Sequence, residues 1–124
     1  IIDELAHNNS SGSRHKFRYQ DIEELLDNGI NVYTTLSVIQ LESNSYMMSN
    51  RIGIKAPYIV PDIFFEQAAQ IIPIDCKIEE IIRRYNSGEI TTSFLTPEQE
   101  TIFFSLDNLT LLKKSFKKLL HLYK

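Results

Sequence analysis

The chain has 124 residues, which is enough for one domain with a hydrophobic core and too few for two ordinary domains. Hydrophobic residues make up 43% and charged residues 23%, a balance that excludes a disordered tail, and the longest apolar runs fall far short of the roughly 20 residues that span a bilayer. The formal net charge of −3 argues against nucleic-acid binding, which needs a concentrated basic surface, and the single cysteine excludes an internal disulfide and fits a reducing compartment.

The first part of the chain predicts a strand, a helix and a second strand. Residues 1–2, both isoleucine, are typical of a strand end, and residues 8–13 form a polar loop rich in turn formers. Apolar residues at helical spacing predict a helix over 19–29, which ends on a glycine. The segment 30–36 (INVYTTL) is rich in β-branched and aromatic residues and predicts a strand parallel to the first.

Two further helices are predicted in the middle of the chain. An apolar face at helical spacing runs over 38–52 and stops at Gly53. The segment 54–62 contains two prolines and predicts a connection or a short edge strand. A short helix over 61–69 follows, because proline is tolerated in a first helical turn.

The remaining segments complete an alternating pattern. Residues 70–75 (QIIPID) predict a third strand, 78–88 predict a helix ending at a glycine, and 109–120 predict an amphipathic helix. Alternating strands and helices indicate an α/β domain with a mostly parallel sheet and flanking helices. We expect an α/β portion over 1–92 and a helical tail over 93–124.

Candidate site residues follow the predicted strands. In open parallel sheets, ligands bind beyond the carboxyl ends of the strands. Asp3 and Glu4 follow the first strand, Thr34 and Thr35 end the second, and Asp75 ends the third. Asp3 on a rigid strand end can hold Mg²⁺, and Glu4 can polarise an attacking water, although a solvated strand end explains the same residues. The two threonines are either phosphate contacts or plain strand residues.

The polar loop and the tail carry other charged side chains. Arg14 can contact a phosphate or carboxylate through its planar donor fork, and His7 and His15 are candidate metal or catalytic groups. The alternative is a polar loop that satisfies its own backbone. Residues 107–124 hold five lysines and one aspartate, which suggests a surface that binds a partner or a membrane, or simply a solvated helix face.

A phosphate-binding glycine-rich loop is absent from the sequence. None of the glycines, at positions 12, 29, 53 and 88, begins the pattern G-x-x-x-x-G-K-[ST]. We therefore expect nucleotide to bind this chain poorly by itself.

Three stretches resemble a known family. They are IDELAHNNSSGSRHKFRYQDIEELLDNGINVYTTLSVIQLES at 2–43, VPD at 60–62 and FFSLDNLTLLKK at 103–114. They are similar to the amino-terminal cytoplasmic domain of the osmosensitive potassium-channel sensor histidine kinases of the KdpD family. That family shows D-E-L-A-H-T-N-x-P-G-S-R-H-x-K-R-[YW]-Q-D-V-E-E-L-L, followed by G-I-D-V-Y-T-T-L-N-V-Q-H-L-E-S.

The resemblance implies a P-loop-like nucleotide-binding fold. Asp3 would be the Mg-linked acid of a Walker B element, Glu4 its partner, and residues 12–15 would match the G-S-R-H loop. The chain looks like the carboxyl-side part of one such domain, truncated before the Walker A loop. Phe17 replaces the lysine of the K-R pair and leaves Arg18 in place.

A second departure affects the segment after the threonines. Gln40 stands where the family has a histidine, and Ser37 stands where the family has an asparagine. Any role of the family's histidine therefore does not carry over to this chain.

The resemblance also implies a role in signalling. We expect a regulatory segment of a bacterial two-component sensor histidine kinase that controls potassium-transporter expression, with Mg-ATP bound in the full domain. The alternative is a module that docks other parts of the sensor and binds no nucleotide. Expected partners are other domains of a membrane-anchored parent and a second copy of the chain, paired through an uncovered sheet edge. The segment itself is expected to be soluble and cytoplasmic, and not catalytic alone.

Overall fold

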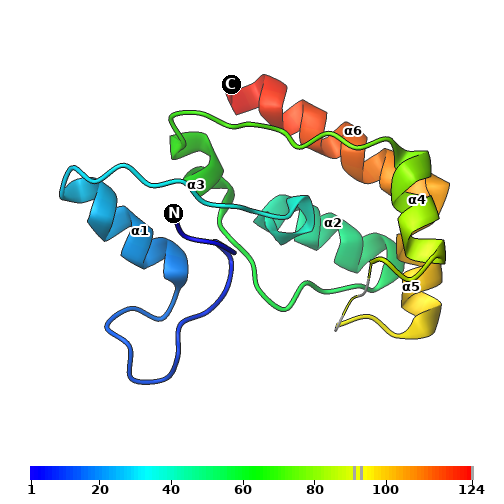
Figure 1. Ribbon diagram of the computed structural model, residues 1–124, viewed down its shortest axis with the longest axis horizontal. Coiled ribbons are helices and arrows are strands. Elements are labelled where there is room, and N and C mark those ends of the chain that lie inside the picture. The colour runs from blue at the N-terminus through cyan, green and yellow to red at the C-terminus, as the bar shows by residue number, and fades with distance from the viewer. Residues whose placement is uncertain (91, 93, 124) are drawn as a thin grey trace.

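The computed structural model describes residues 1–90, 92 and 94–123, which form helices joined by extended connections (Figure 1). The helices in chain order are α1 (Arg18–Asp27), the 3-10 turn η1 (Val38–Gln40), α2 (Glu42–Ile52), α3 (Asp62–Gln67), α4 (Ile78–Asn86), α5 (Pro97–Phe103) and α6 (Leu106–Tyr123). Among the described residues, none of the helices combines the length and hydropathy that a bilayer crossing requires.

The predicted α/β fold with a mostly parallel sheet is wrong. The described residues contain isolated β-bridges and no sheet: Ile2 pairs with Thr34 in parallel, Leu41 with Val60 in parallel, and Asn8 with Phe17 antiparallel. The P-loop-like architecture implied by the resemblance is therefore also not found in the part of the chain that the structure describes.

Exposure explains why the predicted strands do not join into a sheet. Parallel strands are stable where both of their faces are buried. In the second predicted strand the Tyr33 side chain is 73% exposed, and in the third Ile72 is 68% and Ile74 91% exposed. Pro73 also lacks the N–H that a ladder requires. These segments run as extended connections, and the parallel direction predicted for the first two survives at the single Ile2 to Thr34 bridge.

The predicted helices are present, with changes at their ends. The helix predicted over 38–52 is divided at Leu41, whose extended backbone forms the bridge to Val60. Gly53 ends α2 in the left-handed conformation with φ +69°, as its position after the apolar face predicted. Helix α5 was not predicted as a separate helix, although Thr96 and Gln99 form a capping box at its start.

Two apolar clusters hold the structure together. The first, built on Leu5, Ala6, Ile22 and Val60, joins the amino-terminal segment to α1. The second lies between η1, α2 and α6 and is built on buried side chains: Ile39, Met48, Ile54 and Leu112.

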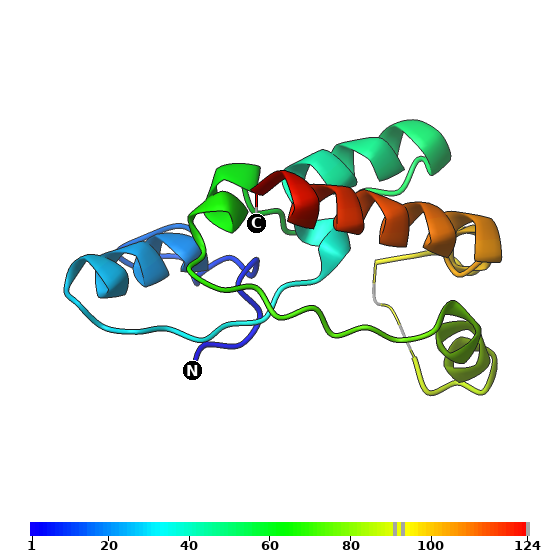
Figure 2. The same cartoon turned by 90° about the horizontal axis from the view of Figure 1, so that it is seen from above.

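A polar contact accompanies the second cluster. Helix α6 runs beside α2 in both views (Figures 1 and 2). The buried Asn44 of α2 accepts a hydrogen bond of 2.6 Å from the Ser115 hydroxyl of α6 and donates one of 2.8 Å to the Val38 carbonyl. The end of the chain is thus fixed to its middle by both apolar and polar contacts.

Candidate functional site

The turn at Asp3 and Glu4 is held between two backbone hydrogen bonds. The Ile2 amide donates to the Tyr33 carbonyl at 2.9 Å, and the Leu5 amide donates to the Thr35 carbonyl at 3.0 Å. Glu4 has φ +51°, a left-handed conformation that is unfavourable for a residue with a side chain. The neighbouring segment therefore keeps Asp3 and Glu4 in a fixed and strained turn.

The Asp3 carboxylate is a polarised and exposed acceptor. Its Oδ1 accepts hydrogen bonds from the Thr35 hydroxyl at 2.6 Å and from the Glu4 amide at 3.0 Å. The Thr35 hydrogen bond, then the Glu4 amide and the charge of Arg18, lower the pKa of Asp3 below its ordinary value. Asp3 is ionised at neutral pH, so it presents a fixed negative charge to solvent.

Arg18 supports this turn from the first residue of α1, a role that the sequence analysis did not assign. Its Nη1 donates to the Asp3 carbonyl at 2.8 Å and to the Glu4 carbonyl at 3.2 Å. The signal in the sequence was that Arg18 remains as the one cation of the family's K-R pair. Helix α1 and the acidic turn are therefore linked through one guanidinium group.

Of the other residues predicted at strand ends, only some lie at the acidic turn. Thr35 joins Asp3, whereas Thr34 points elsewhere because successive side chains alternate along extended backbone. The Thr34 hydroxyl oxygen is buried and has no hydrogen-bond partner among the described residues. Asp75 forms an ion pair of 3.1 Å with Lys113 of α6 and does not complete the acidic turn.

The loop that carries Arg14 and His15 is closed at its base. Asn8 and Phe17 form the antiparallel bridge, and the Asn9 amide donates to the Lys16 carbonyl at 2.9 Å. Gly12 at the loop tip has φ +88°, which glycine adopts without strain.

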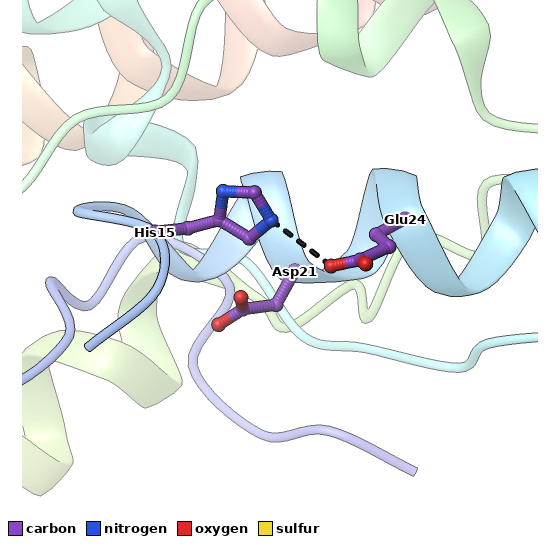
Figure 3. A group of neighbouring side chains, drawn as sticks. All are labelled: His15, Asp21 and Glu24. Atoms are coloured by element: carbon purple, nitrogen blue, oxygen red, sulfur yellow. Dashed lines mark hydrogen bonds and ion pairs between the residues drawn. The ribbon is translucent and has the colours of Figure 1, made fainter.

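Arg14 and His15 both reach Glu24 on α1, and they form a group separate from the acidic turn. Arg14 Nη1 lies 2.7 Å from Glu24 Oε1, and His15 Nε2 lies 3.0 Å from Glu24 Oε2. Asp21, one helical turn before Glu24, accepts a hydrogen bond of 2.6 Å from the Asn9 side chain. Figure 3 shows the imidazole and the Glu24 carboxylate facing each other, with the Asp21 carboxylate beside them.

Asp21 and Glu24 were not among the predicted site residues. The signal that could have found them is their spacing of three residues, which places both carboxylates on one helix face. Without the loop geometry, nothing in the sequence states that this face meets His15.

A small cavity of about 220 Å³ lies at the base of this loop, where Asn8 and Phe17 form part of its lining. Phe17, Tyr19 and Tyr58 line it together with Glu42, and the rings of Phe17 and Tyr19 stack with centroids 5.2 Å apart. None of the predicted site residues lines this cavity. The acidic turn and the group around Glu24 therefore lie outside this cavity.

Comparison with known proteins identifies similar sequences over nearly the whole chain. The family model described as "KdpD: Osmosensitive K+ channel His kinase sensor domain" matches residues 1–119. The sensor protein KdpD of Escherichia coli (strain K12) is 39% identical over 114 residues, and that of Clostridium acetobutylicum is 37% identical over 114 residues. The putative sensor protein KdpD of Synechocystis sp. is 32% identical over 114 residues.

These relatives are longer than the chain. Each match covers 92% of the chain, but only 13% of the Escherichia coli and Clostridium proteins and 31% of the Synechocystis protein. The same sequence region therefore occurs in sensor proteins of different total length.

Proposed function

Because the chain belongs to the KdpD family of osmosensitive K⁺ channel histidine kinase sensor domains, we propose that it is a regulatory segment of a two-component sensor histidine kinase that controls potassium-transporter expression. The proposal is supported by the match over residues 1–119. Its relatives are named as sensor proteins, and the matched region is a small part of the longer ones. We assign the segment to the cytoplasmic side of a membrane-anchored sensor and give it no catalytic role of its own.

The segment acts, in this proposal, together with Mg-nucleotide bound by the full sensor. The observation that carries this part is the ionised and exposed Asp3 carboxylate, which Thr35 and the Glu4 amide hold through Oδ1. A carboxylate held in this way can accept a magnesium ion or one of its waters through its other oxygen. This role of Asp3 requires Thr35 and the Glu4 amide, and it does not require a P-loop architecture.

Other predicted site residues have secondary roles. Glu4, which follows Asp3 in the chain, would polarise a water molecule on a magnesium ion held by Asp3. Thr34 offers a buried hydroxyl without a partner among the described residues. Arg14 supplies donors for phosphate oxygens, at the cost of its present contact with Glu24. Because no glycine-rich phosphate loop occurs in the sequence, the chain alone is expected to hold nucleotide weakly.

The test is Mg-ATP binding to the full-length sensor, measured by calorimetry with and without EDTA. Asp3→Asn keeps the size of the side chain and removes its charge, so we expect about a 10-fold loss of the Mg-dependent affinity. Asp27→Asn, an exposed acid at the end of α1, is the matched control and should bind as the native sensor does. Equal Mg-ATP affinity in the Asp3 variant would overturn the role given to Asp3.

A second candidate function is docking of other sensor domains or of a second copy. The observation that favours it is the exposure of large apolar side chains on extended segments, including Tyr33, Ile72 and Ile74. Replacing Ile72 and Ile74 by serine should weaken association, measured by sedimentation of the sensor's cytoplasmic part, and leave Mg-ATP binding unchanged. Unchanged association in this double variant would eliminate docking through 70–75.

A further inference from the structure

Three potential metal ligands meet where the loop returns to α1. One ligand atom each from His15, Asp21 and Glu24 lies within 4.8 Å of the other two (Figure 3). His15 comes from the loop, whereas the two carboxylates come from successive turns of α1. All three residues are half-buried, so solvent screening is weaker here than around a fully exposed cluster.

The distances between the three ligand atoms suit a small divalent ion. Zinc lies about 2.0–2.2 Å from imidazole nitrogen and carboxylate oxygen, which places neighbouring ligand atoms roughly 3–4 Å apart. His15 Nε2 and Glu24 Oε2 are already 3.0 Å apart. The longest separation, at most 4.8 Å, requires only a small side-chain adjustment.

The three ligands are held by neighbours before any ion binds. Asn9 donates one hydrogen bond to Asp21 Oδ2 at 2.6 Å and another to the His15 carbonyl at 3.0 Å, so it ties the loop to the helix. Arg14 contacts Glu24 through Oε1 and leaves Oε2 directed at His15. Outer partners of this kind orient ligands and reduce the ordering that an ion would have to impose.

Metal coordination would replace the hydrogen bond between His15 and Glu24. Without metal, His15 Nε2 can carry the proton that bridges to Glu24 Oε2. Coordination needs the Nε2 lone pair, so this proton must leave to solvent or shift the tautomer to Nδ1.

We propose that His15, Asp21 and Glu24 form a binding site for a divalent cation of the zinc and manganese type. One imidazole and two carboxylates suit these ions, whereas Mg²⁺ and Ca²⁺ prefer oxygen ligands alone. The bound ion fixes the loop against α1, whose first residue, Arg18, holds the acidic turn. Water or an anionic ligand completes the coordination sphere.

The experiment is titration of the full-length sensor with ZnCl₂ alone, without nucleotide, followed by calorimetry in two buffers of different ionisation enthalpy. His15→Gln and Glu24→Gln each remove a direct ligand. Each should abolish the binding of one Zn²⁺ ion per chain, or weaken it by at least the roughly 10–100-fold that loss of an outer partner costs. Glu23→Gln, on the exposed part of the same helix, and His121→Gln, on the exposed end of α6, are matched controls and should not change binding.

Two further variants keep the result interpretable. Asp21→Asn retains the shape of the side chain and should weaken Zn²⁺ binding even if a His15 variant fails to fold. Asp3→Asn should bind Zn²⁺ as the native sensor does, so failure of the nucleotide proposal and failure of this one are distinguishable. If the His15, Asp21 and Glu24 variants bind as many Zn²⁺ ions as tightly as the native sensor, the site does not exist.

Discussion

The hydrogen bonds of Asn44 allow a quantitative test of how α6 is attached to the rest of the chain. Asn44 is 1% exposed, accepts from the Ser115 hydroxyl and donates to the Val38 carbonyl. Asn44→Ala removes both bonds and leaves the Val38 carbonyl and the Ser115 hydroxyl without this partner. Two bonds at about 1 kcal/mol each, plus the cost of leaving a buried polar group unpaired, lower the free energy of unfolding by about 2–4 kcal/mol.

The assay is urea unfolding of the 124-residue chain followed by circular dichroism, with the free energy obtained from the midpoint and slope. Asn50→Ala, an exposed change on the same helix, should alter the free energy of unfolding by no more than about 0.5 kcal/mol. Ser115→Ala completes a double-mutant cycle whose coupling energy should be about 0.5–3 kcal/mol. If Asn44→Ala costs no more than Asn50→Ala, the contact does not stabilise the packing of α6 on α2.

Two other predictions concern the backbone and the acidic turn. Gly53→Ala should lower the free energy of unfolding by about 1–2 kcal/mol in the same urea assay, because φ is +69° there and a residue with a Cβ is strained in that conformation. A steric clash does not add to this cost, because the new Cβ would meet no atom within 4 Å. A neutral effect would mean that the helix end relaxes. Thr35→Val should raise the pKa of Asp3 toward its ordinary value in an NMR titration, because the Thr35 hydrogen bond is the main cause of the lowered pKa. If the pKa of Asp3 in the Thr35→Val variant equals that in the native chain, the Thr35 hydrogen bond is not the main cause of the lowered pKa. In the native chain, the stabilisation linked to ionised Asp3 is present above its unfolded-state pKa and is lost as the pH falls through the lower folded-state pKa.

The sequence predicted the contacts of the acidic turn only in part. Asp3 and Thr35 were predicted to face a common site, because each lies at the carboxyl end of one of two strands expected to be parallel. The structure joins them by a hydrogen bond of 2.6 Å. Thr34 was assigned with them, but extended backbone turns its side chain to another side, where its hydroxyl has no partner among the described residues. Asp75 was placed in the same group and instead pairs with Lys113, a residue 38 positions away that no local pattern connects to it.

The sequence by itself determined the family and the helices other than α5. Helical spacing and glycine stops can be recognised in the sequence because helix hydrogen bonds join residues only four positions apart. The stretch from IDELAH to QLES, which indicates the family, is likewise a continuous segment of the chain. Strand pairing is different, because each segment needs a partner that is distant in the chain. Segments with a β-branched composition therefore predicted a sheet that the described residues do not form.

Only the tertiary structure decided which side chains meet. It closed the loop over 8–17 on α1 and brought His15 to Asp21 and Glu24. It also placed Arg18 under the acidic turn. These contacts depend on how the amino-terminal segment packs on α1 through Leu5, a long-range burial that carries no local signature in the sequence.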